Sequence, residues 1–319
     1  MIQESTSDKT RSISIVVPVY GCAGILDELC SRLHNSLVAI TDKYEIILVD
    51  DRCHDNAWAA ILRIQENHPE VKGVRLSKNF GQHIAITAGL EKAQGDFAVV
   101  MDCDLQDPPE KIPDMFAKIN EGYDLVMARR IERTHSRFRV ITAKAYFYVL
   151  GKLNKEKIDG RYSSFTMLSR KVIDAFLKFK ERDSHYLFIL RWLGFETGII
   201  EYEHQDRLNG KSSYTLSSLI QHALSGLFFQ TTVFLHWIVG IGLIFSLSGT
   251  GLACFYVYQF FNHGSVAGWT SVVVLILICT GVIVLSLGVT GLYIAKIFDQ
   301  VKKRPLYLID IVSERSSLW

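Results

Sequence analysis

The sequence lacks the motifs of two large classes of nucleotide-binding enzymes. No Gly-x-Gly-x-x-Gly opens a helix after the first predicted strand, and no Gly-x-x-x-x-Gly-Lys-Ser/Thr occurs in the 319 residues. These absences disfavour a dinucleotide-dependent oxidoreductase and a P-loop nucleotide hydrolase. The formal net charge is only +2, so no nucleic-acid partner is expected.

Cysteine motifs and a signal peptide are also missing. No Cys-x-x-Cys pair or zinc-ligand spacing joins the six cysteines, which lie at positions 22, 30, 53, 103, 254 and 279. We therefore expect reduced, mostly buried thiols. Residues 1–11 are polar and charged, so no N-terminal signal peptide is expected.

Two long hydrophobic runs lie in the C-terminal third of the chain. Residues 231–261 and 266–295 contain no charged side chain, and each run exceeds the roughly 20 residues that cross a bilayer as a helix. They predict two transmembrane helices within residues 231–297. A pair of long buried helices in a soluble protein is the alternative.

Basic residues orient this predicted hairpin. The connecting loop at 262–264 has no Lys or Arg, whereas Lys302, Lys303 and Arg304 follow the second span. Because basic segments are retained in the cytosol, both termini are expected there.

Four regions are therefore expected along the chain. An apolar stripe in residues 215–230 predicts an amphipathic helix in the membrane interface, although core packing would give the same stripe. The cytosolic domain precedes this helix as residues 1–214, and a cytosolic tail follows the membrane segment as residues 298–319.

Strand and helix patterns alternate in the predicted cytosolic domain. Short apolar runs alternate with amphipathic segments, the runs lying at residues 13–20, 45–49, 71–76 and 97–101. This alternation predicts an α/β fold with a mainly parallel, doubly wound, Rossmann-like sheet. Ligands bind such sheets at the carboxyl ends of the strands. Four polar clusters are expected at that edge, at residues 18–20, 50–51, 77–79 and 102–104.

Asp102 and Asp104 follow the last of these apolar runs. Side chains alternate along a strand, so both carboxylates are expected to point the same way, and Pro108-Pro109 takes the chain out of the sheet soon afterwards. Oxygen ligands of this kind suit Mg²⁺ or Mn²⁺ shared with substrate phosphates. An acidic turn before a helix is the alternative.

Five motifs occur in order along this domain. They are Val17-Pro18-Val19-Tyr20, Val49-Asp50-Asp51, Ser77-Lys78-Asn79-Phe80-Gly81-Gln82, Gln94-Gly95-Asp96 and Asp102-Cys103-Asp104-Leu105-Gln106-Asp107-Pro108-Pro109-Glu110. The combination resembles the family 2 glycosyltransferases, and more narrowly the membrane-bound polyisoprenyl-phosphate glycosyltransferases related to dolichol-phosphate mannose synthase. The resemblance covers nearly the whole chain and implies the nucleotide-sugar-binding fold called GT-A.

The resemblance also implies roles for single residues. It assigns Asp102, Asp104 and Gln106 to a divalent metal, Mg²⁺ or Mn²⁺, and to the donor diphosphate. The rest of the nucleotide-sugar site that it implies consists of Pro18, Tyr20, Asp50, Asp51, Lys78 and Gly81. Structural alternatives exist, since Pro18 could simply end a strand and either aspartate at 50–51 could cap local backbone.

Basic segments further along the chain resemble the phosphate-binding parts of the family. Residues 126–133 resemble its Val-x-Gly-x-Arg-x-x-Arg segment, which places Arg130 and Arg133 near phosphates. The planar guanidinium suits this task because it grips phosphate oxygens with two bonds.

A second basic segment, residues 207–212, resembles the Arg-x-x-Gly-x-Ser loop of the family. The resemblance implies that Arg207, Lys211 and Ser212 cover the substrate phosphates, and an electrostatic membrane anchor is the alternative. Direct catalytic roles are then expected for Asp104, Arg130 and Arg207. The lipid phosphate is expected to contact Arg133, Ser164, Lys211 and Ser212.

Three segments depart from the pattern of the family. Gly21-Cys22 replaces the usual Asn-Glu, Arg52-Cys53 replaces the usual Gly-Ser, and Ser164 stands where many relatives carry an aspartate proposed as the catalytic base. A lipid monophosphate is mostly dianionic at neutral pH and already nucleophilic, so we expect a strong base to be dispensable.

The expected function is transfer of one sugar from a nucleotide-diphosphate sugar, with a UDP-sugar favoured, to a polyprenyl phosphate at the cytosolic face of a bacterial inner membrane. One alternative is a processive polysaccharide synthase, disfavoured because Phe188 replaces glutamine in the Gln-x-x-Arg-Trp segment of such enzymes. The other is a catalytically inactive scaffold or flippase partner. The lipid bilayer is an expected partner, and the sequence is compatible with a homo-oligomer.

Overall fold

A computed structural model of the chain describes residues 10–131, 161–180, 185–203 and 268–314, together with isolated positions between 238 and 262. The chain divides into two compact units. The first comprises Met1–Lys144, Asp159–Ser213 and Pro305–Trp319, and the second comprises Ala145–Ile158 and Tyr214–Arg304.

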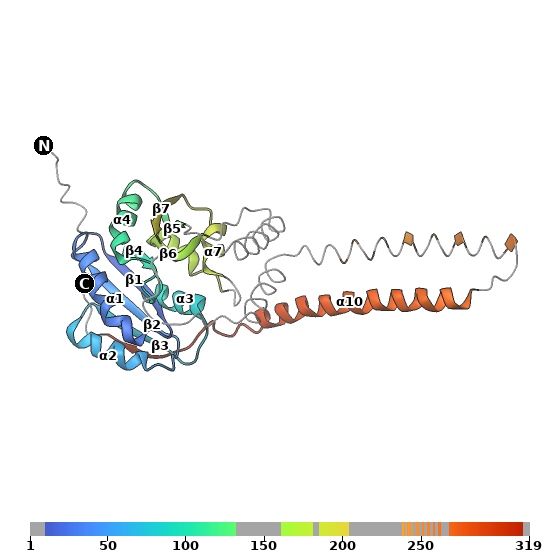
Figure 1. Cartoon of the computed structure of the whole chain (residues 1–319), viewed down its shortest axis with the longest axis horizontal. Helices are drawn as coiled ribbons and strands as arrows, with labels where there is room; N and C mark the ends of the chain where they lie inside the picture. Colours follow the sequence, from blue (N-terminus) through green and yellow to red (C-terminus); the bar gives the residue numbers. More distant parts are fainter. Residues whose placement is uncertain are drawn as a thin grey trace. The chain divides into compact units, whose positions relative to one another are not determined.

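The first unit contains an eight-stranded sheet of order β7-β5-β6-β4-β1-β2-β3-β8 (Figure 1). Its parallel half consists of β1 (Ile13–Val19), β2 (Tyr44–Asp50), β3 (Val71–Leu76) and β4 (Phe97–Val100). This half confirms the predicted parallel arrangement of apolar runs.

The other half of the sheet is mixed. It consists of β5 (Leu125–Ile131), β6 (Tyr162–Ser169) and β7 (Thr197–Glu203). β6 is antiparallel to both β4 and β5, and β5 is parallel to β7. The result is an α/β fold with a mixed, mainly parallel sheet.

Helices cover both faces of the sheet. They are α1 (Leu26–Val38), α2 (Ala57–Asn67) and α4 (Ile112–Asn120) on one face, and α3 (Gln82–Lys92), α6 (Arg170–Phe176) and α7 (Tyr186–Trp192) on the other. Alternate residues of a strand enter opposite cores, as Ile15 and Val17 do on one side and Val16 on the other. The doubly wound architecture follows from strands that are apolar on both faces.

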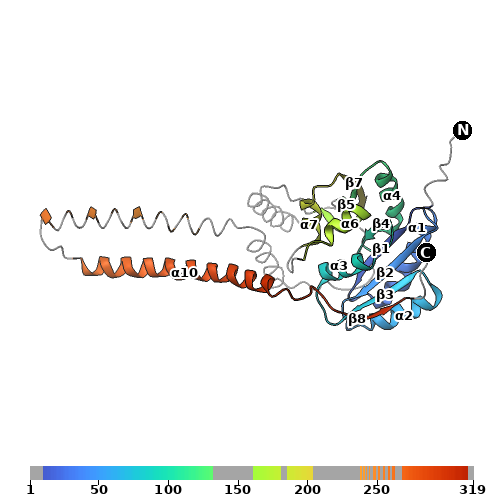
Figure 2. The ribbon, with the colours of Figure 1, turned by 180° about the vertical axis from the view of Figure 1, so that it is seen from behind.

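The predicted C-terminal tail contributes a strand to the sheet. β8 (Ile309–Ser313) pairs antiparallel with β3 and forms the edge beside it (Figure 2). Gln65 of α2 donates to the carbonyl of Ser313 at 2.8 Å and accepts from its hydroxyl at 2.8 Å. Arg52 pairs with Asp310 at 2.7 Å. Part of residues 298–319 is therefore an integral element of the α/β unit.

One described helix is long and apolar enough to cross a membrane. α10 (Trp269–Val301) contains the window Ile278–Ala295, whose mean hydropathy is 2.1 and of which 0% is buried. Most of the first predicted span, residues 231–261, and all of the predicted interfacial helix, residues 215–230, lie outside the described residues. The two-helix hairpin therefore stays a prediction.

Two cysteines are joined, which corrects the expectation of reduced thiols for this pair, whereas Cys30, Cys53, Cys254 and Cys279 are free. Cys22 follows β1, Cys103 follows β4, and a disulfide links them with a Cα–Cα separation of 6.2 Å. The two strands are parallel neighbours, so the turns at their carboxyl ends lie side by side. A sequence separation of 81 residues hides this proximity from any spacing rule.

Candidate active site

The carboxyl ends of β1, β2 and β4 form one edge of the sheet, as predicted. β1 lies between β2 and β4 and is parallel to both. Contacts join the segments that leave these strands: the amide of Ala23 donates to Asp55 at 2.9 Å, and the disulfide joins Cys22 to Cys103. The predicted polar clusters at residues 18–20, 50–51 and 102–104 therefore meet at this edge. The fourth cluster, at residues 77–79, is held beside them by hydrogen bonds from the following residues to Asp51.

Asp51 ties the end of β2 to the loop before α3. Its carboxylate accepts the backbone N–H groups of Phe80 at 2.7 Å and Gly81 at 2.8 Å. Gly81 has φ of +92°, a conformation that favours glycine. Burial raises the pKa of Asp51, and the two N–H bonds oppose that shift. Asp51 thus holds the 77–82 loop in place. This agrees with the alternative from the sequence, in which an aspartate at 50–51 caps backbone groups.

Asp50 also has structural partners. It is 1% exposed, accepts the amide N–H of Cys53 at 2.9 Å and pairs with the guanidinium of Arg75 at 3.2 Å. A carboxylate that is both buried and paired is a fixed part of the protein interior. The nucleotide-binding roles expected of Asp50 and Asp51 remain predictions.

The other predicted nucleotide-site residues lie around this edge. Pro18 is buried in β1 opposite Val49, whereas the Tyr20 side chain beyond the strand is 53% exposed. Lys78 places its ammonium 5.0 Å from the centre of the Phe80 ring. An exposed aromatic ring and a lysine suit stacking and phosphate contacts, respectively.

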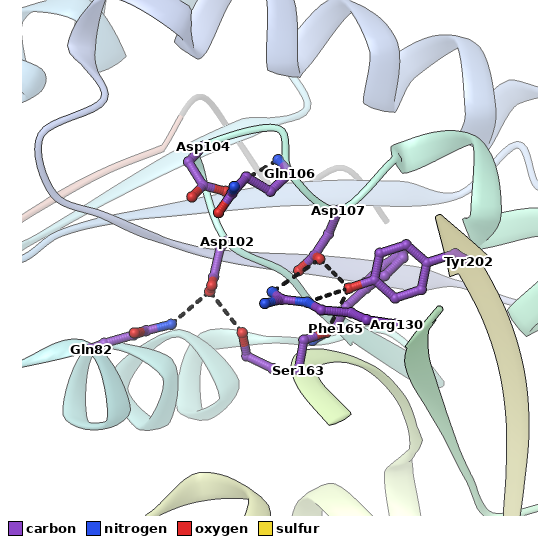
Figure 3. A network of polar contacts seen from close by, with 10 residues as sticks. Gln82, Asp102, Asp104, Gln106, Asp107, Arg130, Ser163, Phe165 and Tyr202 are labelled. Carbon is purple, nitrogen blue, oxygen red and sulfur yellow. Dashed lines mark hydrogen bonds and ion pairs between the residues drawn. The ribbon is translucent and has the colours of Figure 1, made fainter. Parts of the chain in front are cut away.

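Asp102 is held from two sides. Its Oδ1 accepts a hydrogen bond from Gln82 Nε2 at 2.6 Å (Figure 3). The same oxygen accepts a second bond from Ser164 Oγ at 2.8 Å. Burial and, to a smaller extent, the charges of Asp107 and Asp104 together raise the pKa of Asp102 to about 7, while the Ser164 bond and the Arg130 charge oppose the shift. This carboxylate therefore lies in a surplus of negative charge.

Asp104 lies in a turn rather than on a strand, which corrects the alternation argument. β4 ends at Val100, and Leu105 has φ of +57°, so the chain reverses within the acidic motif. Asp104 Oδ1 accepts the amide N–H of Gln106 at 3.2 Å. Turn geometry and not strand periodicity sets the direction of the two carboxylates.

The donor set of this turn suits a hard divalent cation. Among the described residues, no group of three or more His, Cys, Asp or Glu side chains converges closely enough to hold an ion. The set implied by the resemblance has two carboxylates and the side-chain amide of Gln106, and Figure 3 shows Asp104 and Gln106 side by side. Such oxygen ligands, in a surplus of negative charge around Asp102, fit Mg²⁺ or Mn²⁺.

Arg130 extends toward the acidic turn from the far half of the sheet. It lies near the end of β5, and Figure 3 shows its guanidinium between Asp102 and Asp107. Its Nη2 lies 3.4 Å from Asp107 Oδ1, and its Nε donates to Tyr202 Oη at 3.0 Å. The structure thus brings Arg130, Asp102 and Ser164 together.

Sequence reasoning missed several residues that build this site. Gln82 and Asp107 lie inside the motifs that carry the resemblance, and that membership is the signal that could have found them. Ser163 and Tyr202 carry no such signal, because only strand pairing places them beside Arg130. The predicted phosphate-binding residues Arg133, Arg207, Lys211 and Ser212 lie outside the described residues.

Comparison with known proteins assigns the chain to an enzyme family. The family model described as glycosyl transferase family 2 matches residues 14–177. The chain is 32% identical over 314 residues to the undecaprenyl-phosphate 4-deoxy-4-formamido-L-arabinose transferase of Proteus mirabilis, covering 97% of this chain and 96% of that protein. The chain therefore belongs to glycosyltransferase family 2.

Further similarities extend this comparison. The SfII prophage-derived bactoprenol glucosyl transferase of Shigella flexneri is 31% identical over 299 residues, covering 93% of this chain and 97% of that protein. Among solved structures, glucosyl-3-phosphoglycerate synthase from Mycobacterium tuberculosis in complex with Mn²⁺, UDP-glucose and phosphoglyceric acid has a TM-score of 0.46 at 17% identity, covering 68% of this chain and 78% of that one.

Proposed function

We propose that this glycosyltransferase transfers a single sugar, with inversion, from a nucleotide-diphosphate sugar to a polyprenyl phosphate. A UDP-sugar is the favoured donor and undecaprenyl phosphate the favoured acceptor. The carrying observation is that two relatives matching 97% and 93% of this chain are named as transferases for undecaprenyl phosphate and bactoprenol. The product, a polyprenyl-phosphate sugar, would supply cell-envelope or O-antigen glycosylation.

In the proposed reaction, a phosphate oxygen of the lipid attacks the anomeric carbon of the donor sugar. The bond from that carbon to the diphosphate oxygen breaks, and the electron pair leaves with the nucleoside diphosphate. The second pKa of a phosphate monoester is about 6, so the attacking group is mostly dianionic at neutral pH. The protein mainly needs to align the two phosphates and stabilise the leaving charge.

The acidic turn is the proposed diphosphate end of the donor site. Asp102, Asp104 and Gln106 would hold Mg²⁺ or Mn²⁺, which when bound neutralises charge on the leaving diphosphate. Arg130 lies on the same side and would add bonds to phosphate oxygens. The nucleotide itself is assigned to the neighbouring edge of the sheet, at Pro18, Tyr20, Asp50, Asp51, Lys78 and Gly81.

The acceptor end is proposed from the basic segments. Arg207, Arg133, Lys211 and Ser212 would bind the lipid phosphate where the chain approaches the bilayer. The structure gives Ser164 a partner in Asp102, so we propose that it supports the donor side in addition to the lipid-phosphate contact expected from the sequence.

The proposed location is the bacterial inner membrane, with the catalytic unit and both termini in the cytosol. The apolar helix α10 supports membrane attachment, and the predicted hairpin would return the chain to its starting side. A lipid acceptor requires a site at headgroup depth, which membrane attachment supplies. A processive synthase and an inactive scaffold are the competing functions.

A transfer assay tests the proposal. The full-length protein in vesicles would receive undecaprenyl phosphate, Mn²⁺ and each of a panel of radiolabelled nucleotide sugars. One labelled monoglycosylated lipid, formed from one donor, is the expected product. A water-soluble polymer would favour the processive synthase, and absence of transfer from every donor would favour the scaffold. The Asp104→Asn variant is the matched control for background labelling.

A further inference from the structure

Four elements bring polar side chains into one cluster behind Arg130. Arg130 of β5 and Tyr202 of β7 are register partners in a parallel strand pair, so their side chains lie on the same face. Asp107 comes from the turn after β4, and Ser163 comes from β6. Figure 3 shows all four converging.

The hydrogen bonds in this cluster have only one consistent direction. Tyr202 Oη has a single proton, and it donates that proton to Asp107 Oδ1, since a carboxylate only accepts. The tyrosine oxygen then accepts from Arg130 Nε at 3.0 Å and from Ser163 Oγ at 3.0 Å. Ser163 in turn accepts the amide N–H of Phe165 at 3.2 Å. A chain of bonds therefore runs from the β6 backbone to the carboxylate.

The cluster is buried at its base and open at its tip. Asp107 is 0% exposed and Tyr202 is 1% exposed, whereas the Arg130 side chain retains 34% exposure. Nε and Nη2 of Arg130 are occupied by Tyr202 and Asp107. A guanidinium held at two of its nitrogens has lost most of its freedom to rotate, and its remaining N–H groups can meet a ligand in a fixed orientation.

We propose that Tyr202 and Asp107 are positioning residues that lock the Arg130 guanidinium in the orientation needed to bind a substrate phosphate. This inference rests on the proposed function for the identity of the reaction. Asp107 lies three residues after Asp104, so the same bonds also anchor the acidic turn to β7. In this proposal, the cluster sets the spacing between the Arg130 guanidinium and the acidic turn, the two groups that would face the diphosphate.

The rival interpretation is that Arg130 only neutralises a buried carboxylate. The Tyr202→Phe variant distinguishes the positioning role from this interpretation. It removes one hydroxyl and keeps the ring, which packs edge-on against Phe165 with a centroid distance of 5.9 Å. Tyr186→Phe is the matched control, since Tyr186 is also 1% exposed and its hydroxyl bonds Thr166 at 2.6 Å without contacting Arg130. Each variant removes one buried tyrosine hydroxyl. Tyr202→Phe loses three hydrogen bonds, two of them with charged groups, whereas Tyr186→Phe loses one bond to a neutral hydroxyl.

The kinetic test compares these variants in the transfer assay. Tyr202→Phe is expected to lower kcat and kcat/KM by the same factor of about ten, as loss of an interaction made in the transition state does. Tyr186→Phe is expected to keep both kcat and kcat/KM within about twofold. In an Arg130→Lys background, which lacks Nε, Tyr202→Phe should lower kcat by a much smaller factor than in the unmodified protein, because only the Asp107 and Ser163 bonds remain to be lost. Equal losses in the two tyrosine variants, or additive losses in the double variant, would overturn the inference.

A second readout does not depend on the substrate. With ¹⁵N-labelled arginine, the Arg130 Nε–H should give an exchange-protected signal that disappears in Arg130→Lys and loses protection in Tyr202→Phe but not in Tyr186→Phe. Protection that persists in Tyr202→Phe would refute the positioning role. If the signals behave as expected while even the unmodified protein transfers no sugar, the proposed function fails and the positioning geometry stands.

Discussion

Ser164 donates its hydroxyl proton to Oδ1 of Asp102 at 2.8 Å. The position at which many relatives carry a proposed base is thus occupied by a donor to the first carboxylate of the acidic turn. A hydroxyl in this place would orient Asp102, the proposed metal ligand, and is a far weaker base than a carboxylate. The substitution therefore favours a site in which the lipid phosphate is its own nucleophile.

Replacing Ser164 by alanine should affect metal binding more than the maximal rate. Loss of a bond that orients a ligand carboxylate typically weakens metal affinity about ten- to a hundredfold. Ser164→Ala should therefore raise the Mn²⁺ concentration for half-maximal rate by that factor and retain most activity at saturating Mn²⁺. Ser36→Ala, which removes a bond to the Arg32 carbonyl within α1, is the control. If Ser164→Ala stays inactive at every Mn²⁺ concentration, the 159–166 segment has an acid–base role.

Asp104→Asn should lower turnover by orders of magnitude and leave the protein folded. The change removes a charged ligand and preserves side-chain volume. Circular dichroism and the transfer assay measure the two effects, and Asp114→Asn, which alters an exposed ion pair with Lys111, is the control. Chelator should abolish activity, and Mg²⁺ or Mn²⁺ should restore it. Full activity in excess chelator would disprove the metal assignment.

The disulfide between Cys22 and Cys103 should be detectable by mass spectrometry. Under non-reducing conditions, the two cysteines should resist alkylation and appear in one linked peptide, whereas the half-buried Cys53 thiol should react slowly in both conditions. Closing a long loop typically stabilises a protein by about 2–4 kcal/mol, so reduction should lower the unfolding midpoint. Complete alkylation of Cys22 in the oxidised protein would contradict the pairing.

Both ends of the chain should face the cytosol. The loop at 262–264 lacks basic residues, whereas Lys302, Lys303 and Arg304 follow α10. A reporter fused after Trp319 should be active only if it is of the type that works in the cytosol. Periplasmic activity of such a fusion would overturn the hairpin or its orientation.

The sequence predicted the parts of this site that are local. Apolar runs and the polar residues after them located β1 to β4 and the carboxyl edge of these strands. This was possible because the pattern of apolar residues that indicates a buried strand lies within a few consecutive residues. The strand-alternation argument for Asp102 and Asp104 was wrong, because β4 ends before them. Tyr202 was missed, since its proximity to Arg130 arises only when β5 and β7 pair.

The strand β8 has a consequence for the order in which the protein can be completed. A ribosome makes β8 after the 33 residues of α10, whereas β3 has been made long before. Until β8 arrives, the edge of β3 exposes unpaired backbone groups that invite pairing with another chain. Truncations that stop before the hydrophobic segment would leave this edge open permanently. Expression of the α/β unit alone should therefore require a linker from residue 203 to the β8 segment that is long enough to cross the sheet, because β7 and β8 form its opposite edges.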